Sequence, residues 1–381
     1  MSQISPSVPG LLARVALGLA AAGLSVLCLA APARAQAAPT TAVPFLQIEP
    51  DARAVAMGLA GTAAASGPAA QFWNPAALAD LDGAAATLTH APWLAGLDVG
   101  LAYEFLAGAY ALDGVGTLAG HVTYLNLGEQ DRTDAQGQSL GTLRSYELAV
   151  GASVGRAISE RLAVGGGLRL VRSRLDGGAT DAGAATAVAV DLGVRYRLPA
   201  LAAGRVRPTL ALALANAGPA LHYTDDGAGD PLPTTLRAGA AVEAQLDRQS
   251  RLTVVLDATK LLVDRDSSGA PASFVSALFS SWGPVAVDLD GATGTDGNER
   301  LGALRQLTVG TGVEYVFDET LALRTGYFYE DPMNGNRRLL TFGAGFRYNV
   351  VGIDLSYIHA LGEASPMAGQ LYVSLLLNLP R

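Results

Sequence analysis

The chain has very little cysteine, lysine or charge. Of its 381 residues, the only cysteine is Cys28, the only lysine is Lys260, and charged residues make up 16%. Ordinary soluble domains carry about a quarter. Cys28 lies in an apolar stretch of leader type, so we expect the mature protein to have no disulfide and no thiol chemistry. The net charge of −8 argues against a nucleic-acid partner, because binding phosphates needs a basic surface.

The start of the chain has the pattern of an export signal. Arg14 precedes the apolar run 15–30, and Ala-Arg-Ala at 33–35 matches a small-residue cleavage site. The run is shorter than the ~20 residues that a membrane-spanning helix needs. The leucine before Cys28 does not fit a lipoprotein signal. We therefore interpret residues 1–35 as the signal peptide of a protein exported in a bacterium.

Glycine and apolar residues, by contrast, are abundant: 45 residues are glycine and half of the chain is apolar. No other apolar run is long enough for a membrane helix, and only helices and closed barrels satisfy the backbone inside lipid. An apolar face alternates with a polar or glycine face in 307–317, 339–349 and 370–379. A soluble sandwich would also alternate, but its outer face would carry more lysine and glutamate. The sequence therefore predicts a closed antiparallel outer-membrane β-barrel, with lipid as a partner.

Polar, glycine-rich connections divide this barrel into about fourteen strands, an even number as such barrels require. The predicted strands cover 84–90, 97–109, 115–127, 143–157, 161–175, 184–198, 205–216, 234–247, 250–262, 305–317, 320–330, 338–349, 352–361 and 369–379. The longer connections are predicted at 128–142, 176–183, 217–233, 263–304, 331–338 and 362–368. They alternate with short turns, which predicts outer loops, periplasmic turns and two periplasmic termini. Within 263–304, residues 274–282 are predicted to form either a short helix or a hairpin arm with 285–289.

The stretch 45–81 has no period of two and lacks the pattern of a strand. Asp51 is placed to start a helix at 52–57, and Asn74 with Pro75 is placed to start another at 76–81. We expect residues 36–82 to plug the lumen of a barrel formed by 83–381. Five side chains of this plug are expected inside the barrel: Asp51, Arg53, Trp73, Asn74 and Pro75.

The predicted strands carry charges on their inward faces, where they avoid lipid. They are Glu147, Arg169, Asp191, Arg195, Arg237, Glu243, Arg324 and Arg347. Two roles remain open: pairing across the wall, or holding the plug through Asp51 and Arg53. The glycines at 165–167 and 310–312 either let the wall curve or let another segment pack close to it.

Other patterns that suggest chemistry are weak. The four histidines lack metal-ligand spacing, and the acidic run around Asp288 and Asp290 fails the calcium-loop template because Ala292 takes a ligand position. We predict no catalytic residue, no metal and no cofactor, and hence no enzyme. Aromatic residues near strand ends are expected to anchor the barrel at the two membrane interfaces. They are Trp93, Tyr103, Tyr124, Tyr196, Tyr223, Tyr315, Tyr327, Tyr348 and Tyr357.

Several motifs together resemble the PorV (LptO) family of the type IX secretion system, within the FadL-like fourteen-stranded group. The motifs are 50–53 (PDAR), 73–76 (WNPA), 91–94 (APWL), 127–129 (LGE), 168–173 (LRLVRS), 215–218 (ANAG), 232–234 (LPT), 312–315 (GVEY), 324–330 (RTGYFYE), 335–337 (GNR) and 341–349 (TFGAGFRYN). The WNPA piece is shared with the broader group, whereas the last three motifs before the C-terminus are specific. The connection at 263–304 matches only loosely.

The resemblance implies a non-enzymatic outer-membrane protein of type IX secretion. Such a protein binds the C-terminal domain of secreted cargo and shuttles it from the translocon to the attachment complex that contains the sortase PorU. Glu330, Asn336 and Arg337 match the family motif at an outer loop and are expected to face cargo. The alternative for them is turn structure, because Asn334-Gly335 is a good turn pair. Two other functions remain: a FadL-like transporter of hydrophobic molecules with a movable hatch, and, more weakly, a lipopolysaccharide-modifying enzyme.

Overall fold

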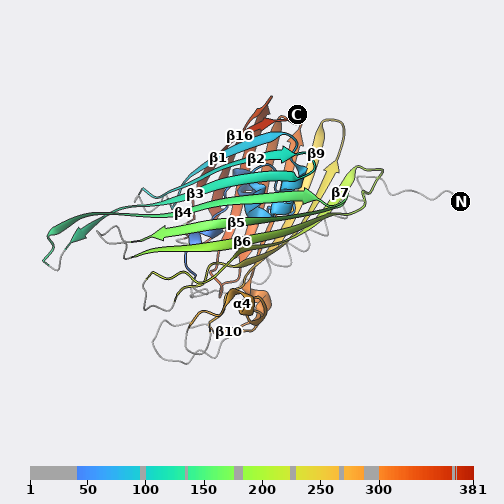
Figure 1. The fold of residues 1–381 in the computed structure, drawn as a ribbon. Coiled ribbons are helices and arrows are strands. Elements are labelled where there is room, and N and C mark those ends of the chain that lie inside the picture. The colour runs from blue at the N-terminus through green and yellow to red at the C-terminus, as the bar shows by residue number, and fades with distance from the viewer. Residues whose placement is uncertain are drawn as a thin grey trace.

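The computed structural model describes residues 41–94, 100–133, 136–175, 183–223, 229–265, 270–286, 300–362, 365 and 367–381. Within these ranges, fourteen strands form one closed antiparallel barrel in which β1 pairs with both β2 and β16 (Figure 1). The strands are β1 Ala84–Pro92, β2 Ala102–Leu112, β3 Gly116–Thr133, β4 Ser139–Ala157, β5 Leu162–Arg174, β6 Ala184–Arg197, β7 Val206–Ala217, β8 Thr235–Gln245, β9 Ser250–Leu261, β12 Leu307–Phe317, β13 Leu321–Glu330, β14 Arg338–Tyr348, β15 Val351–Ala360 and β16 Leu371–Leu379. The predicted fold class is confirmed.

The connection between β9 and β12 carries an arm outside the barrel sheet. It contains α4 (Phe274–Ser280), a two-stranded sheet of β10 (Val285–Ala286) and β11 (Arg300–Leu301), and the 3₁₀ helix η4 (Ala303–Gln306). The sequence left a helix or a hairpin open for this region. The structure has the helix, because Ser273 accepts a hydrogen bond from the Ser276 N–H at the start of α4. The hairpin alternative is wrong, since Val285 and Ala286 pair with Leu301 and Arg300 and not with 274–282.

One predicted loop is wrong in part. Residues 128–142 were expected to form a polar connection, but β3 continues to Thr133 and β4 begins at Ser139. The pairing resumes at Glu129–Arg144 after a register shift. The backbone hydrogen bonds between β3 and β4 continue through this region, although neither strand has an apolar face here. The alternation that identifies a membrane strand is therefore missing from residues that are nevertheless extended.

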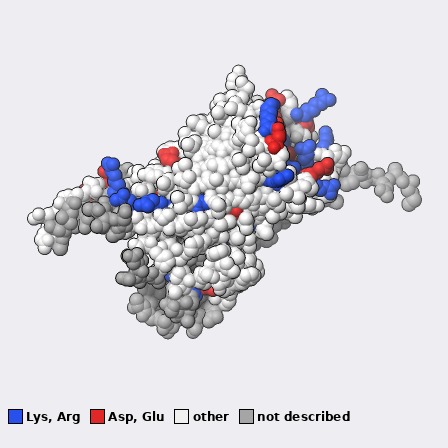
Figure 2. Space-filling model, viewed as in Figure 1, with Lys and Arg blue, Asp and Glu red and all other residues white. Residues whose placement is uncertain are grey.

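The two faces of the barrel wall differ in the way that the alternation predicts. Leu168 and Leu323 point outward and are 62% and 63% exposed, whereas Thr341 and Ser374 point inward and are at most 1% exposed. Figure 2 shows charged side chains gathered toward two ends, with a largely uncharged surface between them. None of the helices in the described ranges is long and apolar enough to cross a membrane.

Residues 41–83, which we call the N-terminal segment, lie inside the ring of strands (blue in Figure 1). Its elements are η1 (Pro44–Gln47), α2 (Ala52–Ala56), α3 (Ala70–Trp73) and η2 (Pro75–Asp80). Asp51 caps α2 by accepting from the Ala54 N–H at 2.8 Å. Asn74 caps η2 by accepting from the Ala76 N–H at 3.0 Å. The helix expected at 76–81 is a 3₁₀ helix, and α3 was not predicted.

Wall glycines let this segment touch the strands backbone to backbone. A Cβ added at Gly165 would lie 2.3 Å from the carbonyl carbon of Pro75, and one at Gly312 would lie 2.4 Å from the Met57 oxygen. No side chain fits at such a distance. Of the two roles left open for these glycines, the close approach of another segment is the one that the contacts support. Because η2 packs on β3–β6 and α2 on β13–β16, the segment bridges opposite parts of the wall.

Candidate functional site

A continuous chain of ion pairs joins the N-terminal segment to the wall. Arg53 donates to both oxygens of Glu314 on β12, at 2.8 and 2.7 Å. The same carboxylate accepts from Arg324 on β13 at 2.6 Å, and Arg324 donates to Asp354 on β15 at 2.7 Å. Arg347 forms a second ion pair with Asp354 and is the last member of this series of ion pairs. Burial alone would lower the pKa of Arg53, but the Glu314 carboxylate holds it above its usual value.

Four further residues of the segment have equally specific partners. The Trp73 indole donates to Asp51 at 2.6 Å, and the Asn74 side chain donates to the Val194 carbonyl of β6 at 3.0 Å. Burial raises the pKa of Asp51, although the Ala54 N–H and the Trp73 indole oppose that shift. Pro75 packs on Gly165 of the wall, whereas the described partners of Asp51 lie within the segment itself.

The inward charges divide between the two roles that the sequence left open. Arg169 pairs with Asp191 across the wall at 2.9 Å, and Ser173 donates to Glu147 at 3.2 Å. Arg195 instead pairs with Asp80 of the segment, and Arg237 donates to the Phe72 carbonyl at 2.9 Å. Glu243 pairs with Arg207 on the neighbouring strand at 3.6 Å. The partner of Arg53, Glu314, was not among the charges that we singled out.

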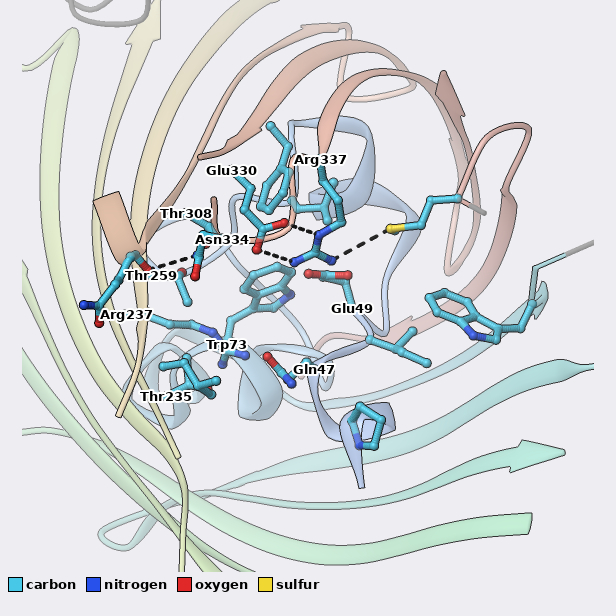
Figure 3. Close-up of a pocket in the computed structure, with 18 residues that line it drawn as sticks. Gln47, Glu49, Trp73, Thr235, Arg237, Thr259, Thr308, Glu330, Asn334 and Arg337 are labelled. Carbon is cyan, nitrogen blue, oxygen red and sulfur yellow. Dashed lines mark hydrogen bonds and ion pairs between the residues drawn. The ribbon is translucent and has the colours of Figure 1, made fainter. Parts of the chain in front are cut away.

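A cavity of about 320 Å³ lies between the N-terminal segment and the ends of β8, β9, β12 and β13 (Figure 3). The N-terminal segment lines one side through Gln47, Glu49 and Trp73. The strands and the connection after β13 line the other, through Thr235, Arg237, Thr259, Thr308, Glu330, Asn334 and Arg337. Apolar side chains complete the lining, among them Ile48, Leu59 and Phe328. The cavity therefore combines an apolar surface with a few charged and hydroxyl groups that could orient a guest.

Glu330 and Arg337 form a bidentate pair on this cavity. Arg337 donates to the two Glu330 oxygens at 2.6 and 3.1 Å, and its guanidinium carbon lies 5.3 Å from the Phe328 ring centroid. Burial disfavours the charged guanidinium, but the Glu330 carboxylate raises the pKa of Arg337. Asn336, grouped with them by motif, does not line the cavity. Its φ of 55° and its N–H bond to the Asp331 carbonyl make it part of the turn.

Glu49 is the lining residue that sequence reasoning missed. Its carboxylate points toward Arg337 in Figure 3, yet no side chain in the described ranges donates a hydrogen bond to it. Burial in the lumen raises its pKa to about 7, against the opposing effects of its own backbone N–H, Arg337 and Arg237. The available signal was the single charged residue in the mostly apolar stretch 43–50.

Three predicted interface anchors lie on the inner side of the barrel instead: Trp93 lines the cavity, Tyr223 donates to the inward Ser173, and Tyr103 is the most deeply buried. Tyr103 is fully buried inside the barrel, and its hydroxyl donates to the Ile48 carbonyl at 3.2 Å. It shares the inward face of β2 with Phe105 and Ala107, both buried. The alternation along β2, and not the distance from the strand end, decides which way the ring points.

Metal-binding clusters are absent from the residues that the structure describes. The acidic run at 288–290, with Asp296 and Glu299, lies outside those residues. The expectations of no metal, no cofactor and no enzymatic activity stay predictions.

The fold defines the class of this protein: a closed antiparallel β-barrel, with fourteen strands in the residues that the structure describes. The Ralstonia pickettii toluene transporter TbuX is 16% identical, with 87% of this chain and 99% of that chain covered and a TM-score of 0.50. The Pseudomonas putida toluene transporter TodX is 14% identical, with 87% and 99% covered and a TM-score of 0.52. A Pseudomonas aeruginosa FadL homologue is 14% identical, with 90% and 100% covered and a TM-score of 0.46. At these identities the likeness concerns the fold alone.

The family follows from the sequence. The model of the type IX secretion system protein PorV matches residues 31–268, which is more than half of the chain. The chain belongs to the PorV family. Among curated proteins no sequence match was found. The protein is therefore a type IX secretion protein of the outer membrane.

Proposed function

We propose that this protein binds the C-terminal domain of secreted cargo and shuttles it from the type IX translocon to the PorU-containing attachment complex. The observation that carries the proposal is the PorV family match. The cavity lined by Glu49, Glu330 and Arg337 supports it, because it offers charged and hydrogen-bonding groups beside the connection after β13. In this proposal the cavity and the longer connections receive the cargo domain.

The N-terminal segment is, on this proposal, a permanent plug. Residues 36–82 close the lumen of a barrel formed by 83–381, with both termini in the periplasm and the longer connections outside the cell. The ion pairs of Arg53 and the glycine contacts of Pro75 support a plug that stays in place. A shuttle that holds cargo at the surface needs no passage through its own barrel.

The second candidate is a transporter of hydrophobic molecules. TbuX and TodX are toluene transporters, and their folds resemble that of this chain. One observation weighs against the transporter: the segment that would have to move is held to the wall at Arg53 and at Asn74. We also expect no enzymatic role.

Deleting the gene in its host tests the proposal. We expect proteins with type IX C-terminal domains to be lost from the cell surface and to keep those domains unprocessed. Restoring the wild-type gene should restore both, whereas a variant with Arg337→Ala and Glu330→Ala should restore them only in part. If the cargo reaches the surface and is processed normally in the deletion strain, the shuttle is wrong. Loss of growth on a hydrophobic substrate in that strain would support the transporter.

A further inference from the structure

The arm between β9 and β12 carries an uncharged, strongly exposed apolar surface. Residues 270–286 contain no charged residue. Leu304 and Phe279 are 82% and 79% exposed, and Val275 is 52% exposed. Such side chains in one short arm mark a contact surface, because a scattered exposed leucine is ordinary but a patch is not.

The arm is fastened to the outward face of the barrel wall. Asp257 of β9 points inward, since it accepts from the Gly61 and Thr62 N–H groups of the N-terminal segment. Lys260 lies three residues further on and so points to the opposite face. Its ammonium donates to Gln306 at 2.6 Å and lies 5.4 Å from the Trp282 ring centroid.

Gln306 also holds the rest of the arm close to Lys260. Its amide nitrogen donates to the Gly283 carbonyl at 3.0 Å and to the Leu301 carbonyl at 2.9 Å. The only lysine of the chain is thus buried at the base of the arm, on the wall face that elsewhere meets lipid. The base of the arm therefore packs against the lipid-facing side of β9, at the rim of the cavity that Gln306 also lines.

Polar and apolar groups of the arm are separated. Ala277 is buried, whereas Phe274, Val275 and Phe279 of the same helix are exposed. The Trp282 indole donates to the Leu278 carbonyl at 2.9 Å, which satisfies its polar atom within the arm. Two described charges lie close to the arm, and both have partners: Lys260 donates to Gln306, and Arg305 pairs with Asp331 of the connection after β13 at 2.9 Å. Within 270–286, which includes α4, there is no charged group that would have to enter an apolar phase.

We propose that the apolar face of this arm lies in the membrane leaflet beside the longer connections, with Phe279, Val275 and Leu304 in contact with lipid. Helices with aromatic and aliphatic side chains on one face and polar side chains on the other lie at the boundary between headgroups and acyl chains. The occupant is lipid because the arm is contiguous with the wall that already faces lipid. Docking there would hold the arm beside the barrel rather than across its opening.

Site-directed spin labelling tests this inference in the folded barrel. In a Cys28→Ser chain each introduced cysteine is unique. Phe279→Cys, carrying a nitroxide, is compared in phosphatidylcholine vesicles with Leu168→Cys on the lipid-facing wall and Glu160→Cys in an exposed turn. All three sites are exposed on the protein, so the labels should not disturb packing. Heat-modifiable gel mobility confirms that each variant has a folded barrel.

We expect the label at position 279 to be readily reached by molecular oxygen and poorly reached by a water-soluble nickel chelate. Its accessibility to the chelate should match that at 168 and lie at least fivefold below that at 160. Accessibility to the chelate equal to that at 160 would place the arm in water and overturn the inference. Protection from both reagents would mean that protein covers the arm, and would overturn it as well.

Discussion

The two halves of the lumen are built differently. Near the short turns, the N-terminal segment touches the wall backbone to backbone at Gly165, and its charges are satisfied by wall partners such as Arg195. Near the longer connections, the same segment leaves a cavity of about 320 Å³, and the Glu49 carboxylate has no side-chain donor among the described residues. We infer that close backbone contacts and ion pairs favour a segment that stays in place, whereas a cavity with charged groups in its lining offers room for a guest.

Among changes to the half near the short turns, breaking the ion-pair chain should have the largest effect on stability. Replacing Glu314 by Ala leaves Arg53 and Arg324 buried without their shared carboxylate. The free energy of unfolding should fall by about 3 to 5 kcal/mol. Urea titration of the refolded barrel in micelles, followed by tryptophan fluorescence, measures the change.

The matched control for Glu314 is Glu319, whose pair with Arg251 is exposed at 2.7 Å. Glu319→Ala should cost less than about 1 kcal/mol. Equal losses for the two variants would mean that the buried chain does not fasten the segment.

The next test adds a side chain at a wall glycine that contacts the N-terminal segment. Gly165→Ala puts a methyl group 2.3 Å from the Pro75 carbonyl carbon, so the segment must shift away from β5. We expect a loss of about 1 to 3 kcal/mol in the same titration. The neighbouring Gly166→Ala places its methyl no closer than 3.5 Å to any atom and should be nearly neutral. A neutral result at 165 would show that the segment is not pressed against this wall.

Glu49, in the half of the lumen that contains the cavity, should make the stability of the protein depend on pH. Its pKa is about 7 in the folded protein and near 4.5 in the unfolded chain. Between these values the folded state binds more protons, so this carboxyl lowers stability as pH rises from about 5 to about 7. Burial raises the pKa of Asp51 too, which acts in the same direction. We expect Glu49→Gln to reduce the fall by roughly 2 kcal/mol. Parallel curves for variant and wild type across this pH range would contradict the raised pKa.

The smallest effect concerns cargo affinity, and it rests on the proposed function. Arg337→Lys keeps a positive charge but loses the two-fold hydrogen bonding to Glu330. The affinity for an isolated type IX C-terminal domain should drop about fivefold, or about 1 kcal/mol. Surface plasmon resonance on the detergent-solubilised barrel measures it, with Arg207→Lys at the opposite end as control. An unchanged affinity would remove Arg337 from the contact surface.

Local patterns in the sequence predicted most of the fold. Alternation located the barrel strands, and Asp51 and Asn74 marked helix starts because a cap depends on neighbours only two or three residues away. The extension of β3 and β4 escaped notice because it has no apolar face. Tyr103 was placed at an interface by its distance from a strand end, when the alternation along β2 was the stronger signal.

The site was harder to predict than the fold, for a physical reason. The pair of Arg53 and Glu314 spans 261 positions, so the choice of partner depends on barrel register and on how the segment enters. Glu330 and Arg337 are seven positions apart and flank one turn, so a local motif found both. Glu49 was missed because an unsatisfied carboxylate is defined by what surrounds it in space, which the local sequence does not specify.

Hydrogen–deuterium exchange, with and without a bound type IX C-terminal domain, tests the central claim most directly. That claim is that the N-terminal segment stays fixed while the cavity beside it receives the cargo domain. We expect amides in 52–80 to stay protected in both states, because Gly58, Gly61 and Thr62 donate to wall side chains. Amides in 331–337 should gain protection when cargo binds. Faster exchange of 52–80 in the presence of cargo would mean that the segment moves, and would contradict the account.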